Sequence, residues 1–228
     1  KPIIPAATYT AETNDAVFTV DVPDGAFAEE VELQVSKIEN ESKLKEYTDQ
    51  ANEALTSNQV VAGVRAYDIS FVSKGSGEEL EPADTVSVGI RFKGSAIAKD
   101  VSDEEVTSLS VVHLPENNEA QVMASVDSVK EAEMEFKADG FSVYVVTSNV
   151  EAAAANGENG FATMQEAIDA AENGDTIVLK KAIAENVTIT DKTITIDTNG
   201  QTWLSKNNYS TTGVGSIITV SNSTLALV

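Results

Sequence analysis

The sequence contains no cysteine and only one histidine, His113. The absence of cysteine excludes disulfides, thiolate nucleophiles and cysteine-bound zinc, and a single imidazole excludes metal sites built from several histidines. Basic side chains are also scarce, with 15 Lys and Arg against 37 Asp and Glu. The resulting charge of −22 at pH 7 repels nucleic acids and anionic membranes, so we expect neither as a partner.

Long apolar runs are missing too, and none approaches the roughly 20 residues that a membrane-spanning helix needs. The composition, 42% hydrophobic and 23% charged, is that of a globular protein. The length of 228 residues is enough for one large or two small domains. The chain begins at Lys1 without a signal pattern, which we interpret as a processed or excised piece. A cysteine-free, acidic chain rich in Thr and Val is typical of the exterior of Gram-positive bacteria, so we expect a secreted protein at the cell surface or in the cell wall.

Short runs of β-branched residues with alternating polarity cover the region from residue 17 to residue 147. Their number exceeds what most single sheets hold and predicts an antiparallel β-sandwich. The runs occupy residues 17–22, 31–38, 60–72, 85–92, 107–114, 121–126, 134–137 and 141–147. One helix is inserted at 41–56, where Leu44, Tyr47 and Ala51 recur at helical spacing, and we expect it to cap an open end of the sandwich.

The composition divides the chain into four parts. We predict a leader at 1–14, the sandwich at 15–149, a linker at 150–160 and a second β domain at 161–228. The linker is predicted because four consecutive alanines, followed by Asn and Gly residues, show no periodic apolar face.

The second β domain is expected to open with a helix at 163–173, which places Met164, Ala167 and Ile168 on one face. A strand, corner, strand pattern at 187–196 then returns about 30 residues later, matching Val187 with Ile217. Such an echo predicts parallel coils that stack on each other, with Ile, Val and Leu facing the neighbouring coil. Because the last apolar run is not followed by a polar tail, we expect a cut through a longer, stacked domain.

Five short motifs in series within residues 15–148 resemble the ZU5-like β-sandwich modules of cell-surface proteins from Firmicutes. They are Val22-Pro23-Asp24-Gly25-Ala26-Phe27, Tyr67-Asp68-Ile69-Ser70-Phe71, Glu79-Leu80-Glu81-Pro82, Val111-Val112-His113-Leu114 and the stretch from Phe136 to Tyr144. In eukaryotic relatives of that fold, a His-Phe-Ser triplet breaks its own backbone when the Ser hydroxyl attacks the preceding carbonyl. Here the triplet is Gly140-Phe141-Ser142, so the adjacent base is missing and only His113 could replace it.

Residues 160–228 resemble the opening of right-handed parallel β-helix domains of the pectate-lyase type, with a capping helix before the first coil. The motifs are the stretches from Phe161 to Ile168, from Gly174 to Leu179 and from Thr193 to Gly200. Such domains occur in polysaccharide-cleaving enzymes and in bacterial surface proteins without known activity, and the opening does not separate these classes.

Candidate binding residues lie in polar stretches. Carboxylates at Asp100, Asp103, Glu104 and Glu105 could hold Ca²⁺ or form a solvated acidic loop; apart from this ion we expect no cofactor. Trp203 and Tyr209 could stack on a sugar ring, and the alternative is that Trp203 packs across the end of the first coil.

Two further residues, His113 and Asp68, are candidates for special chemistry. We expect His113, in a strand beside Val111 and Val112, to be a core or interface histidine and not a metal ligand. A Lys-to-Asn isopeptide crosslink would need a buried carboxylate such as Asp68, which faces solvent if Tyr67 and Ile69 point inward.

These patterns predict a non-catalytic structural or adhesive segment of a Gram-positive surface protein that presents a surface to host or dietary glycans or to host proteins. The alternative is the front region of a carbohydrate-active enzyme whose active site lies beyond residue 228. The absence of phosphate-binding and nucleophile-elbow motifs favours the first.

Overall fold

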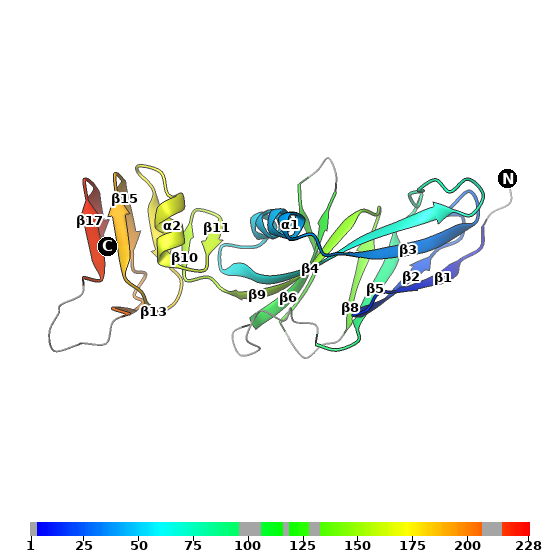
Figure 1. The fold of residues 1–228 in the computed structure, drawn as a ribbon, viewed down its shortest axis with the longest axis horizontal. Coiled ribbons are helices and arrows are strands. Elements are labelled where there is room, and N and C mark those ends of the chain that lie inside the picture. Colours follow the sequence, from blue (N-terminus) through cyan, green and yellow to red (C-terminus); the bar gives the residue numbers. More distant parts are fainter. Residues whose placement is uncertain (1–3, 96–105, 116–118, 128–132, 207–215) are drawn as a thin grey trace. The chain divides into compact units, whose positions relative to one another are not determined.

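The chain is mostly β-strand. The computed structural model describes residues 4–95, 106–115, 119–127, 133–206 and 216–228, which hold two helices (Figure 1). Two compact units are present: unit 1 comprises Lys1–Ala54 and Val61–Asn149, and unit 2 comprises Leu55–Val60 and Val150–Val228. The prediction of an all-β chain with two helices is confirmed for the described residues.

One sheet of unit 1 has four antiparallel strands. In sheet order these are β1 (Ala7–Glu12), β2 (Ala16–Val22), β5 (Val86–Phe92) and β8 (Glu133–Ala138). The alternation in β5 explains its two faces, because Val86, Val88 and Ile90 are buried while the residues between them are not.

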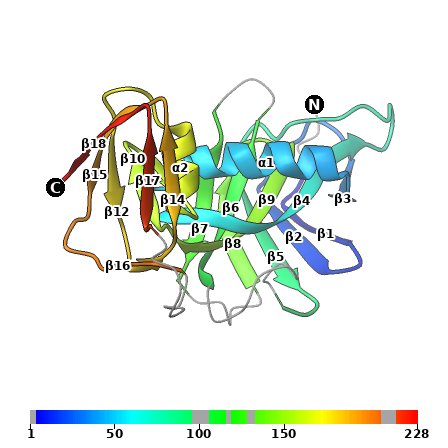
Figure 2. The same ribbon diagram turned by 60° about the vertical axis from the view of Figure 1, so that its left-hand side comes forward.

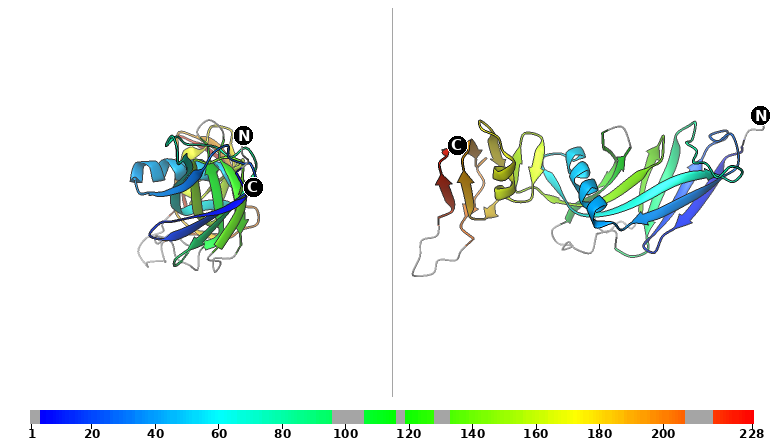
Figure 3. Two further views of the ribbon diagram at one scale, coloured as in Figure 1. Left: turned by 90° about the vertical axis from the view of Figure 1, so that its right-hand side faces the viewer. Right: turned by 45° about the horizontal axis from the view of Figure 1, so that its top comes forward.

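The other sheet of unit 1 has five strands. In sheet order these are β3 (Val31–Ile38), β4 (Gln59–Ser73), β9 (Val143–Glu151), β6 (Val106–Leu114) and β7 (Gln121–Val126). The helix α1 (Glu41–Ala54) follows Asn40, whose side-chain oxygen accepts a hydrogen bond from the Lys43 N–H at 3.0 Å and so begins the helix. Helix α1 lies outside the sandwich and contacts β6 and β7 (Figure 3).

A single hydrophobic core joins the two sheets, which gives unit 1 its sandwich-like architecture. Aromatic rings from both sheets meet in it, with Phe18 of β2 lying 4.9 Å from Tyr67 of β4 between ring centroids. Phe136 of β8 lies 5.2 Å from Tyr144 of β9. Because successive residues of a strand point to opposite faces of the sheet, a shift of the strand register by one residue would turn these rings to solvent.

Unit 2 begins with an antiparallel hairpin and continues with parallel strands (Figure 2). Its strands are β10 (Ala154–Asn156), β11 (Asn159–Phe161), β12 (Thr176–Leu179), β13 (Ile183–Ala184), β14 (Val187–Thr190), β15 (Thr193–Asp197), β16 (Trp203–Leu204), β17 (Ile218–Ser221) and β18 (Thr224–Leu227). Three separate ladders are parallel: β12 with β15 and β18, β13 with β16, and β14 with β17.

The corners between successive parallel strands also repeat. Asp191 follows β14 with a φ of 56°, and Asn222 follows β17 with a φ of 49°, a region that Asp and Asn tolerate better than other residues with a Cβ. The Asn222 amide donates a hydrogen bond to the Asp191 carboxylate across 31 residues of sequence. The repeated polar corner therefore keeps the two ladders in the same register.

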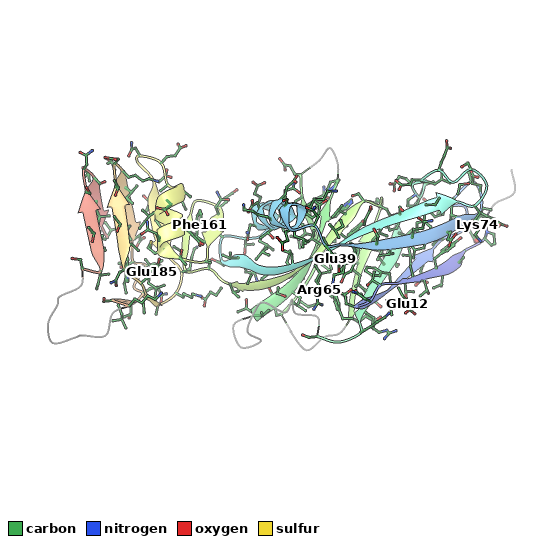
Figure 4. The ribbon with its side chains drawn as sticks, in the orientation of Figure 1. Glu12, Glu39, Arg65, Lys74, Phe161 and Glu185 are labelled. Atoms are coloured by element: carbon green, nitrogen blue, oxygen red, sulfur yellow. The ribbon has the colours of Figure 1, made fainter. Side chains whose placement is uncertain are left out.

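The helix α2 (Met164–Ala170) covers the apolar end of these ladders and is held at both termini. Thr163 and Glu166 form a capping box, and the Glu185 carboxylate, labelled in Figure 4, accepts the Met164 N–H at 2.9 Å and the Gln165 N–H at 3.0 Å. At the other end, the Lys192 ammonium donates to three carbonyls within 2.7–2.8 Å. Each charge has the sign that the helix dipole favours at its end.

Replacing Glu185 with Ala should lower the free energy of unfolding of unit 2 by about 1–2 kcal/mol, because two helix N–H groups lose their acceptor. Trp203, the only tryptophan, lies in unit 2 and reports its unfolding in denaturant by fluorescence. Glu158→Ala, which removes an exposed carboxylate of the same unit, is the control. Equal losses in the two variants would contradict the capping role.

Three details of the sequence prediction are wrong. Residues 7–12, expected in a leader, form β1, which pairs along β2. Residues 154–160 of the expected linker belong to the β10–β11 hairpin, which ends at Phe161, and its two alanines are buried. The repeat is shifted by one residue, since Val187 pairs with Ile218 and not with Ile217.

Candidate functional site

A pocket of about 830 Å³ opens in unit 1 where β6 ends and β9 begins. Helix α1, strand β4 and residues 79–81 form its other walls. Its polar lining includes Lys43, Glu46, Asp68, Glu81, His113 and Ser142. This pocket is the candidate site, because it combines a cavity large enough for a small molecule with the only imidazole of the chain.

The backbone from Gly140 to Ser142 is fixed on the wall of this pocket. The Tyr144 hydroxyl donates to the Gly140 carbonyl at 2.6 Å, and the Phe141 N–H donates to Glu81 Oε2 at 2.9 Å. The Ile69 N–H of β4 donates to the Ser142 carbonyl at 3.0 Å. Three neighbouring elements therefore hold the segment that precedes β9.

Ser142 meets His113 at this point. The distance from His113 Nε2 to Ser142 Oγ is 2.9 Å, although the two residues are 29 positions apart. The imidazole stacks on the Tyr144 ring with centroids 4.4 Å apart and planes 10° apart, which fixes its orientation. Ser142 Oγ also lies 3.1 Å from the Leu114 carbonyl oxygen. The histidine expected in the core or an interface is thus half-buried and paired with the serine of the Gly-Phe-Ser triplet.

Burial sets the protonation of the groups around this pair. It lowers the pKa of the His113 imidazole, which is therefore neutral at pH 7. Burial also raises the pKa of the Tyr144 hydroxyl, which keeps its proton and continues to donate to Gly140. A neutral imidazole beside a hydroxyl can accept its proton, so the pair has the chemistry of a base and a nucleophile.

The Glu81 carboxylate is the titratable group that contacts the backbone of the 140–142 segment. Desolvation raises the pKa of Glu81, and the hydrogen bond from the Phe141 N–H offsets part of this effect. A carboxyl with a raised pKa in the folded state adds stability below its unfolded pKa and loses that contribution as the pH rises through the folded pKa.

Replacing Glu81 with Gln should therefore remove this loss of stability at higher pH, while the amide oxygen still accepts from Phe141. The expected result is a melting temperature that increases relative to that of the original chain as the pH is raised from about pH 4 to 7. Glu46→Gln is the matched control in the same pocket, since the exposed Glu46 carboxylate is not among the groups that shift the pKa of Glu81. An unchanged pH dependence in Glu81→Gln would contradict this role.

Of the residues predicted from the sequence to bind ligands, the structure describes only Trp203, which does not line this pocket. Trp203 is half-buried in unit 2, where it packs against the apolar cluster and its indole N–H donates to the Glu185 carbonyl at 2.8 Å. Tyr209 and the calcium candidates Asp100, Asp103, Glu104 and Glu105 lie outside the described residues. Within the described ranges, no group of three or more His, Asp and Glu side chains could hold a metal ion.

Asp68 is exposed while its neighbours Tyr67 and Ile69 are buried. The carboxylate required for an isopeptide bond should be buried, so Asp68 does not have the required setting. It lines the pocket instead, on the same wall as Ser70.

Comparisons with protein-family models, with curated proteins and with solved structures found no match to this chain. Neither helix in the described part of the chain is long and apolar enough to cross a membrane.

Proposed function

We propose that the chain is a structural and adhesive segment of an extracellular, wall-associated bacterial protein. In this proposal unit 1 is a ZU5-like module that presents a binding surface. Unit 2 consists of the first coils of a parallel β-helix that acts as a rigid support. Host or dietary glycans and host proteins are the partner classes.

The observation that carries this proposal is the repetition in unit 2. Parallel ladders at three places, with Ile177 of β12 in register with Ile196 of β15 and Ile196 in register with Leu227 of β18, are what stacked coils require. A helix covering one end of the ladders, as α2 does, is the usual way to keep an apolar stack from water.

Charge and chemistry also favour a supporting role. The net charge of −22 keeps such a chain soluble at high local concentration. Stability without cysteine suits a protein that functions outside the cell, since it does not depend on redox conditions.

The test is a binding screen of the intact chain, fluorescently labelled, on a glycan array and on immobilised host matrix proteins. Saturable binding to a member of either class is expected, with the bound glycan recovered at its original length. The heat-unfolded chain serves as the control. Absence of saturable binding to both classes would contradict the adhesive function, and shortening of the glycan would mean that the chain cleaves glycans and does not merely bind them.

A further inference from the structure

We propose that Ser142, with His113 as its base, is a nucleophile that takes the acyl group of an uncharged or cationic ester bound in the pocket of unit 1. This activity goes beyond the structural and adhesive function and does not depend on it. It rests on the contact between the two side chains and on the cavity in front of them.

The positions of His113 and Ser142 support their pairing as base and nucleophile. The 2.9 Å between His113 Nε2 and Ser142 Oγ lies within the range that proton transfer requires. The imidazole is held against Tyr144, and the Ser142 backbone is held by Ile69, so neither partner needs to move to meet the other. Both residues line the pocket, which leaves the hydroxyl accessible to a bound molecule.

The hydroxyl carries one proton and has two acceptors within reach. It donates either to the Leu114 carbonyl, 3.1 Å away, or to His113 Nε2. In the first arrangement the serine is an ordinary hydrogen-bonded side chain. When the imidazole proton is on Nδ1, rotation about the Cβ–Oγ bond gives the second arrangement, in which Nε2 accepts the hydroxyl proton.

The charges around the cavity select the ligand class. Four carboxylates line it, from Glu46, Asp68, Glu79 and Glu81, against the single ammonium of Lys43. A pocket with this balance repels an anionic ester and attracts a cationic one, and an uncharged ester enters without an electrostatic penalty.

The proposed reaction is an acyl transfer from the ester to Ser142. Ser142 Oγ bonds to the carbonyl carbon of the ester while its proton passes to His113 Nε2. The bond from that carbon to the leaving oxygen then breaks, and the alcohol departs with the proton from His113. The products are an ester of Ser142, a free alcohol and a neutral His113, without an oxidant or any other co-reactant.

The experiment treats the intact chain with an uncharged alkyl fluorophosphonate, in which Ser142 Oγ would bond to phosphorus as fluoride leaves with the serine proton. Mass spectrometry should find one adduct per chain, located on Ser142. We expect no adduct in Ser142→Ala and labelling about 100-fold slower in His113→Gln. Ser70→Ala, which removes another hydroxyl of the same pocket, should label at the original rate. Acetylcholine, a cationic ester, should protect Ser142 at lower concentrations than the anionic ester acetylsalicylate does.

Several outcomes would overturn the proposal. These are no adduct on the folded chain, an adduct that persists in Ser142→Ala, or equal rates with and without His113. Better protection by the anionic ester would overturn the ligand class. Two fragments whose masses sum to that of the chain plus one water, with the break before Ser142, would assign the pair to backbone cleavage instead. Circular dichroism of each variant confirms folding, so that loss of labelling is not caused by unfolding.

Discussion

Phe71→Ala should lower the free energy of unfolding of unit 1 by about 3–5 kcal/mol. The Phe71 ring is fully buried and lies 5.1, 4.8 and 5.2 Å from the rings of Tyr9, Phe27 and Phe141 between centroids. Truncation therefore leaves a cavity among three aromatic rings and removes their edge contacts. Chemical denaturation followed by near-ultraviolet circular dichroism of the tyrosines, four of which precede residue 150 within unit 1's described ranges, measures the loss.

Ser70→Ala is the matched control for Phe71→Ala, because Ser70 is the preceding residue of β4 and lies outside the hydrophobic core. It should change the free energy of unfolding by less than about 0.5 kcal/mol. Since Phe71 supports Phe141 and Phe141 precedes Ser142, the Phe71→Ala variant should also slow the labelling of Ser142. A loss near that of Ser70→Ala would contradict the position of Phe71 at the centre of the core.

Ile196→Ala should lower the free energy of unfolding of unit 2 by about 2–5 kcal/mol. Ile196 is fully buried in β15 and is in register with Ile177 of β12 and Leu227 of β18. Its removal opens a cavity in the middle of an apolar row that continues from one strand to the next. Fluorescence of Trp203 during denaturation measures the loss.

Thr195→Ala tests whether the Ile196 effect belongs to the buried row. Thr195 lies in the same strand and ladder but is only partly buried. Its truncation should cost less than about 1 kcal/mol. Similar losses for the two variants would mean that the buried row does not carry the stability of unit 2.

The bounds of two strands could be predicted closely from the sequence. The predicted bounds 31–38 and 121–126 coincide with β3 and β7. The face of α2 was also predicted, because Met164, Ala167 and Ile168 are the residues that it buries. In α2 and in the first half of β3 the periodicity of the apolar residues follows directly from which face meets a core.

Strand β1 and the β10–β11 hairpin could not be predicted in this way. Strand β1 is an edge strand whose alternating apolar residues are two alanines and Tyr9, none of them fully buried, so its hydrophobic pattern is weak. The alanines before Asn156 are all buried and show no period. Local sequence carries little information where the apolar face of a strand is weak or where both faces are buried.

The candidate site depends on contacts that the sequence does not specify. The pairing of Ser142 with His113 requires β6 and β9 to be neighbours in a particular register, which is a property of the whole sheet. The available signals were that His113 is the only histidine and that the Gly-Phe-Ser triplet lacks an adjacent base. The contact of Glu81 with Phe141 had no such signal, since the two residues are 60 positions apart.

The stacking of parallel strands in unit 2 is tested most directly by engineered crosslinking. The chain has no cysteine, so a Thr188→Cys, Thr219→Cys double variant contains only the introduced pair. Thr188 and Thr219 are register partners in the parallel β14–β17 ladder and are both exposed, and the spacing of neighbouring strands suits a disulfide. Mild oxidation should close this pair, whereas Thr188→Cys with Val220→Cys should remain reduced because adjacent residues face opposite sides. Closure of the second pair and not the first would contradict the register on which the stacked coils depend.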